Sequence, residues 1–159
     1  MLLLTHYLIV FLISMVPLIE LRGAIIYAVG FDLPYFPALA VSAIGNMLPV
    51  PIIYFFARKV LIWGADKKYI GKFFRFCLEK GERGGQKLVK KTGRGGLFLA
   101  LMLFVGIPLP GTGAWTGTLA ASFLNMGIKS TAAAVSLGVI IAGIIMGAAS
   151  TGVFSIIGL

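Results

Sequence analysis

The apolar residues of this chain form long blocks that a water-soluble fold of this size could not bury. Hydrophobic residues make up 59% of the 159, only 12% are charged, and the mean hydropathy is +1.02. A soluble domain has roughly 25% charged residues, and a small domain buries only about two-thirds of its surface on folding. The remaining apolar surface must meet lipid. We therefore expect a single all-α integral membrane domain over residues 1–159.

The charged residues are concentrated in one segment, residues 58–94. This segment holds twelve of the fourteen Lys and Arg residues and three of the five acids, a net charge of +9, and the rest of the chain sums to zero. By the positive-inside rule, a basic excess in a short loop marks the cytoplasmic side. This rule accounts for the charge, so we expect no nucleic-acid partner. The prediction is a multi-pass protein of the cell membrane.

Four apolar blocks flank the basic segment, and two of them are continuous. Residues 34–57 and 131–157 are each long enough to span a bilayer as a helix at about 1.5 Å per residue. The other two blocks, residues 2–31 and 97–127, are interrupted near their middles. The sequence therefore predicts two ordinary transmembrane helices and two broken elements.

The interruptions are charged residues in one block and helix breakers in the other. Glu20 and Arg22 lie within the first block, and the sequence PLPGTG occupies 108–113 in the second. Proline removes a backbone donor and glycine loosens the backbone. Non-helical backbone at membrane depth persists only where protein or a water-filled cavity satisfies its polar groups.

A broken block followed by an intact helix occurs twice, in residues 1–57 and again in 95–159. This order is typical of transporters built from internal repeats. A shift of ninety residues also aligns Arg22-Gly23-Ala24-Ile25 with Thr112-Gly113-Ala114-Trp115. We expect two inverted repeats, each a re-entrant helical hairpin plus a transmembrane helix, joined by the basic segment 58–94.

Two topologies remain open. Re-entrant hairpins would leave both termini outside and put thirteen of the fourteen basic residues, Lys129 included, in the cytoplasm. If both broken blocks instead span as kinked helices, Lys129 lies outside and both termini lie inside. We favour the hairpins because they satisfy the positive-inside rule more fully.

The basic segment contains a pattern typical of a helix on the membrane surface. Apolar residues recur at spacings of three and four between basic ones; they are Tyr69, Ile70, Phe73, Phe74, Cys77 and Leu78. Such a helix binds membrane lipids through anionic headgroups. The alternative is a solvated connector whose apolar stripe packs on its own protein.

Glu20 and Arg22 are the strongest candidate site, because ionisable residues inside a membrane segment are costly and usually functional. Glu20 could exchange a proton, and the planar guanidinium of Arg22 could hold an anion. The structural alternative is a salt bridge between the two that locks the hairpin tip.

The expected hairpins would also aim helix N-termini at the membrane centre. The helices after the two breaks are expected to begin near Gly23 and Gly113, with Thr112 as an N-cap for the second. Free N–H groups at such ends, together with Arg22, form a site for a phosphate or carboxylate. The alternative for this motif is a tight structural turn, formed by Pro108, Pro110 and Gly111.

Two further residues are candidates with a weaker signal. Trp115 could stack on a ligand, although packing is the favoured interpretation. Asn46 could hydrogen-bond a hairpin tip, or join two helices as polar residues do in membranes. We find no metal-ligand spacing, no nucleophile–base set and no phosphate loop, so we expect neither an enzyme nor a cofactor nor a metal.

The sequences ELRGAI at 20–25 and GIPLPGTGAWTG at 106–117 resemble the two signatures of the small multidrug export protein family. That family is similar in pattern to the wider DedA superfamily, whose members are linked to lipid-phosphate carriers and lipid scramblases. The resemblance implies paired re-entrant hairpins in inverted orientation. We therefore expect a proton-coupled carrier or flippase of an amphipathic anion such as a lipid phosphate, with Glu20 as the coupling group.

Two other functions stay open. The first is export of small lipophilic cations bound by Glu20, which Arg22 two residues away disfavours. The second is a membrane scaffold that transports nothing. We also consider a homodimer, because 159 residues enclose a polar cavity poorly.

Overall fold

The computed structural model describes residues 2–67, 69, 71–109 and 111–157. Side chains are described for all of these except residues 2, 77–78, 81–82, 84–85, 88 and 151–157. Within these ranges the protein is all-helical. The helices are α1 (Leu2–Met15), α2 (Glu20–Gly30), α3 (Tyr35–Met47), α4 (Pro49–Ala65), α5 (Gly71–Gly106), α6 (Ala114–Phe123) and α7 (Ile128–Ile157).

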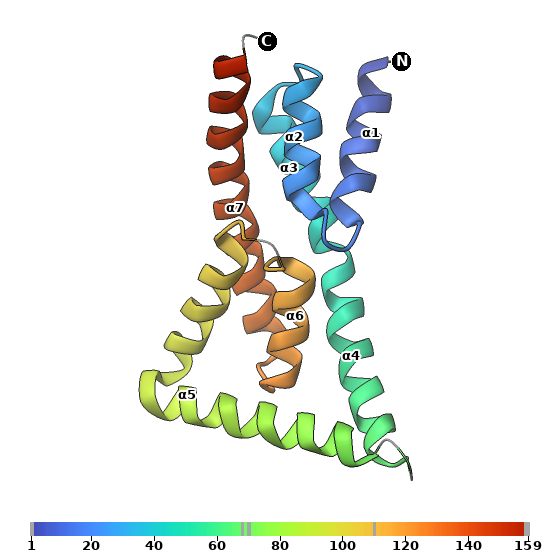
Figure 1. Cartoon of the computed structure of the whole chain (residues 1–159), viewed down its shortest axis with the longest axis vertical. Helices are drawn as coiled ribbons and strands as arrows, with labels where there is room; N and C mark the ends of the chain where they lie inside the picture. The colour runs from blue at the N-terminus through green and yellow to red at the C-terminus, as the bar shows by residue number, and fades with distance from the viewer. Residues whose placement is uncertain (1, 68, 70, 110, 158–159) are drawn as a thin grey trace.

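The helices form an elongated bundle closed at one end by part of α5 (Figure 1). From the end that carries both termini, α1 runs toward the middle, α2 returns, and α3 and α4 together cross to the opposite end. There the first part of α5 lies across the bundle, and its second part rises to the middle. Helix α6 runs back toward the α5 end, and α7 then runs from beside α6 to the end that carries both termini.

Two stretches are long and apolar enough to cross a membrane, Tyr35–Ala65 and Ile128–Ser150. The first begins one residue into the predicted block 34–57 and continues to Ala65, so the predicted end of that helix was eight residues short. Pro49 and Pro51 lie in its middle, and each lacks the N–H that would continue the ladder. The helix is therefore divided at Leu48, whose own φ of −62° and ψ of −41° keep its direction helical.

The outer surface of the bundle is apolar, and its interior contains many small residues. Leu4, Phe36 and Ile52 are 76%, 79% and 64% exposed. Inside, a Cβ on Gly138 of α7 would lie 2.7 Å from the carbonyl oxygen of Met102, so the absence of a side chain lets α5 and α7 touch. Small residues at helix contacts and large apolar residues facing outward are typical of membrane bundles.

Helix α5 contains the predicted surface helix and then bends. Gly93 has a φ of +73° and a ψ of 175°, which divides α5 into a part lying across the bundle and a rising part, residues 94–106. Phe73 is 66% exposed, whereas the ring of Phe74 packs on Gly64 of α4. The predicted apolar stripe thus divides between an exposed face and a face on the protein itself. Three of its members, Ile70, Cys77 and Leu78, lie outside the described side chains.

Candidate functional site

The turn between α1 and α2 (residues 16–19) and the loop between α5 and α6 (residues 107–113) meet near the middle of the molecule (Figure 1). With the first residues of the helices that follow them, these segments are called the first tip (residues 16–22) and the second tip (residues 107–115). Two side chains at the start of α2, Glu20 and Arg22, join them. Both side chains reach across to the second tip, at points that carry opposite partial charges.

The first tip turns sharply through residues that have side chains. Leu18 has a φ of +71° and Glu20 a φ of +53°, in the left-handed region that L-residues seldom occupy. Each such residue costs about 1–2 kcal/mol. The backbone N–H of Glu20 donates to the carbonyl of Val16 at 3.0 Å, which closes the turn. This geometry is sustained by surrounding contacts, as is typical of functional sites.

The carboxylate of Glu20 binds the N-terminus of α6. The backbone N–H of Ala114 donates to Oε2 at 3.1 Å, and that of Trp115 donates to Oε1 at 3.0 Å. Glu20 is only 4% exposed. The first N–H groups of a helix lack partners within the helix and carry a partial positive charge, so a buried anion is favourable there. An acid from a distant helix therefore caps α6.

Gly113, the residue before α6, has a backbone that only glycine adopts easily. Its φ is +148°, and a Cβ at this position would lie 2.1 Å from Oε2 of Glu20. A side chain here would push the carboxylate away from α6. The close approach of Glu20 to the helix N-terminus thus depends on Gly113.

Arg22 binds the carbonyl oxygens that follow α5. Its Nη1 donates to the carbonyl of Leu109, and its Nη2 lies 3.4 Å from the carbonyl of Ile107 and 2.7 Å from Oγ1 of Thr112. Backbone carbonyl oxygens are strong acceptors, and a charged donor makes the stronger hydrogen bonds with them. The carboxylate of Glu20 therefore binds the start of α6, and the guanidinium of Arg22 binds the loop that follows α5.

A salt bridge between Glu20 and Arg22, the structural alternative for this pair, does not form. Both side chains are described, and they form no ion pair within 4.0 Å of each other. Positions i and i+2 of a helix do not face each other, so the two side chains diverge. Each instead finds its partner on the second tip.

Thr112 does not cap α6, which corrects the predicted N-cap. The N-cap residue is Gly113, with no side-chain cap bond. The Thr112 hydroxyl accepts from Arg22 and lies 2.8 Å from each of the carbonyl oxygens of Ile107 and Leu109, to one of which it can donate. Thr112 therefore organises the loop. Its neighbour Gly111 provides the turn, with a φ of +82°.

The remaining turn residues and Gly23 have structural surroundings. Pro108 is half-buried in the second tip, and Pro110 lies outside the described residues. Helix α2 begins at Glu20 rather than near Gly23, and the N–H of Gly23 donates to the carbonyl of Ile19 at 3.1 Å. The expectation of an anion donor at Gly23 is therefore wrong. A Cβ there would lie 2.2 Å from Cγ2 of Ile19, so Gly23 permits close packing.

Three buried polar atoms of the described residues lack a hydrogen-bond partner: Oδ1 of Asn46, Nε1 of Trp115 and Oγ1 of Thr118. Buried groups of this kind are uncommon in proteins. The backbone of Trp115 already binds Glu20, and its indole N–H is still available. Thr118, one turn further along α6, was not predicted, because a lone threonine in an apolar helix has no distinguishing pattern.

An apolar exterior, two helices long enough to cross a bilayer and a buried charged junction define a helical membrane protein. The chain belongs to the family described as "Putative small multi-drug export protein", which matches residues 20–145. The match begins at Glu20, so it covers Glu20, Arg22 and all of the second tip. No curated protein and no solved structure matches the chain.

Proposed function

We propose that the protein is a multi-pass transporter of the cell membrane in which two re-entrant hairpins meet at their tips. The first hairpin is α1 with α2, and the second is residues 94–106 of α5 with α6. Each is followed by a spanning helix, so the chain consists of two inverted repeats. The same arrangement underlies our proposed link to the DedA superfamily.

Two observations support the inverted repeat. Arg22 and Thr112, ninety residues apart, occupy equivalent positions in the two aligned motifs, and their side chains touch at 2.7 Å. Contact between equivalent residues is expected next to a pseudo-twofold axis. Lys129 lines one cavity with Lys90 and Arg94. Lys129 therefore lies beside the basic segment. The hairpin topology requires this proximity, whereas the kinked-helix topology would put Lys129 on the other side of the membrane from that segment.

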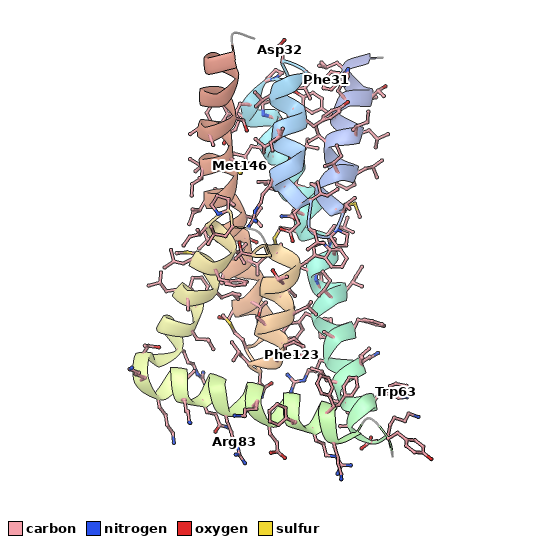
Figure 2. All side chains as sticks on the ribbon, in the orientation of Figure 1. Phe31, Asp32, Trp63, Arg83, Phe123 and Met146 are labelled. Atoms are coloured by element: carbon pink, nitrogen blue, oxygen red, sulfur yellow. The ribbon has the colours of Figure 1, made fainter. Side chains whose placement is uncertain are left out.

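Cysteine labelling tests the topology. Figure 2 shows Phe31 at one end of the molecule and Arg83 at the other. In a background with Cys77 replaced by serine, Phe31→Cys should react with a membrane-impermeant maleimide from outside. Arg83→Cys and Lys129→Cys should react only after the membrane is opened, because the positive-inside rule places them in the cytoplasm. Reaction of Lys129→Cys in intact cells, with Phe31→Cys protected, would reject the hairpins.

The contact between Glu20 and α6 supports a mechanism that couples protons to an anion. While ionised, the Glu20 carboxylate occupies the N–H groups of Ala114 and Trp115. A protonated carboxyl loses both charge-assisted bonds, which frees the helix N-terminus for another anion. Arg22 lies within the same junction and can meet a phosphate or carboxylate with its planar donors. The proton and the anionic substrate would thus bind together.

The substrate class we propose is an amphipathic anion such as a lipid phosphate. The anionic part would replace the Glu20 carboxylate at α6, and its apolar part would stay against the exposed apolar faces of the bundle. The single observation that carries the proposal is the binding of a buried carboxylate to a helix N-terminus on the opposite tip.

Purified protein in liposomes tests the proposal. Movement of a fluorescent lipid phosphate between leaflets should exceed that in empty liposomes and should rise when a proton gradient is imposed. The control variant is Asp32→Asn, because Asp32 is an exposed carboxylate in the α2–α3 turn, away from the tips. Equal movement in protein-containing and empty liposomes would favour a scaffold that transports nothing.

Export of lipophilic cations is the second candidate, and the family description favours it. In that case the Glu20 carboxylate would release the N–H groups of α6 and bind the cation instead. Both of its oxygens already accept N–H donors, so the cation would have to separate the tips first. Uptake of a fluorescent lipophilic cation by the same liposomes, with no movement of the lipid phosphate, would establish this function instead.

A further inference from the structure

A cavity of about 680 Å³ lies at the α5 end of the bundle, away from the two tips. It is open on one side and is lined by α5 on both sides of its bend, by the loop between α6 and α7, and by the first residues of α7. We call it the basic cavity. Its size is within the range of small-molecule sites, roughly 300–1,000 Å³.

Among the described residues, three cations line the basic cavity, two from α5 and one from α7. Lys90 precedes the bend at Gly93, Arg94 follows it, and Lys129 belongs to the first turn of α7. None of the described lining residues is an acid. The first turn of a helix adds a partial positive charge to that of the three side chains. Several positive charges converging on a concave site without a counter-charge attract an anion.

The α6–α7 loop, which forms part of the wall of the basic cavity, is held in place by two side chains of α4. Nη1 of Arg58 donates to Oδ1 of Asn125, and the hydroxyl of Tyr54 donates to the carbonyl of Met126. These bonds tie the loop to α4. A site whose wall is held by such supporting bonds is formed before its ligand arrives.

An apolar groove adjoins the basic cavity. A second hollow of about 200 Å³ shares Leu97, Leu124 and Met126 with it and extends between the rising part of α5 and α6, past Ala100 and Phe104. A free phosphate ion would make no use of this groove. A ligand with a charged head and a hydrocarbon chain would fill both parts.

We infer that the basic cavity binds the phosphate headgroup of an anionic phospholipid, with one acyl chain in the apolar groove. The site is separate from the tip junction, so it does not depend on the proposed transport. Basic residues near the cytoplasmic membrane surface attract such lipids in general. This site differs in being a cavity with defined walls, which predicts saturable and headgroup-selective binding.

The test uses the purified full chain in detergent and measures binding of dioleoyl phosphatidic acid by native mass spectrometry and by thermal shift. We expect saturable binding, with dioleoyl phosphatidylcholine bound much more weakly. The triple variant Lys90→Gln, Arg94→Gln, Lys129→Gln should bind phosphatidic acid about tenfold more weakly or worse, since it removes every cation of the cavity wall. A matched control, Lys72→Gln, Lys80→Gln, Lys87→Gln, removes the same charge from α5 outside the cavity and should retain wild-type affinity.

Two further measurements distinguish the source of the phosphate and guard against misfolding. Ala100→Trp fills the groove and should weaken binding of the dioleoyl lipid while leaving that of a dihexanoyl lipid nearly unchanged. Equal loss in both triple variants would overturn the inference, because it would show diffuse attraction to α5. So would inorganic phosphate competing at the same concentrations as the lipid, since the ligand would then need no acyl chain.

Discussion

Replacing Gly113 with alanine is expected to separate the two tips and to lower the stability of the protein strongly. The new Cβ would lie 2.1 Å from Oε2 of Glu20, and the backbone would stay at a φ of +148°. Overpacking costs about 1–3 kcal/mol, and a side-chain-bearing residue in such a conformation costs about 1–3 kcal/mol more. The free energy of unfolding should therefore fall by roughly 2–6 kcal/mol, and the melting temperature by about 10 °C.

Gly111 is the matched control for this variant. It belongs to the same tip and has a φ of +82°, but nothing lies within 4 Å of the Cβ that alanine would add. Gly111→Ala should lower the free energy of unfolding only by the cost of holding alanine in a left-handed backbone conformation. Adding Glu20→Ala to Gly113→Ala removes the clashing carboxylate, so the double variant should be more stable than the sum of the two single effects predicts. Equal melting temperatures for the two glycine variants would show that the contact with Glu20 is unimportant.

The sequence predicted where the broken elements lie but not how they meet. Glu20, Arg22 and the PLPGTG motif were found because charges and helix breakers stand out in an apolar block. Their partners were not found. Arg22 binds the carbonyls of Ile107 and Leu109, and a backbone carbonyl has no sequence signature. Which tip approaches which is decided by packing of the whole bundle, which local patterns do not report.

Helix boundaries differed from prediction for similar reasons. The charge of Arg58 suggested that the spanning helix ends at Ala57. Arg58 is only half-exposed, however, and its guanidinium binds Asn125, so α4 continues past it. Lys and Arg extend their charged ends from an apolar helix in this way. The bend in α5 lies at Gly93, one residue before the predicted end of the basic segment. There the sequence Thr92-Gly93-Arg94-Gly95-Gly96 offered three glycines, any of which could have bent the helix.

Replacing Glu20 with glutamine is expected to abolish proton-driven transport while leaving downhill exchange of the same substrate. Glutamine keeps the volume of the side chain but cannot bind or release a proton. It has one acceptor oxygen for the two N–H groups of Ala114 and Trp115, and its NH₂ group must face the other. The helix N-terminus also loses a negative charge, which contributes about 0.3–2 kcal/mol. The tips should therefore part more readily at every pH.

The measurement compares two rates in liposomes at matched protein amounts. Accumulation of the lipid phosphate against its gradient, driven by an imposed proton gradient, should fall by at least about tenfold, the equivalent of 1.4 kcal/mol of lost coupling. Exchange without any gradient should persist and should no longer vary with pH. Asp32→Asn is the control, because it removes an exposed carboxylate at a φ of +54° that asparagine tolerates. A Glu20→Gln protein that still accumulates substrate with the wild-type pH profile would show that another group carries the proton.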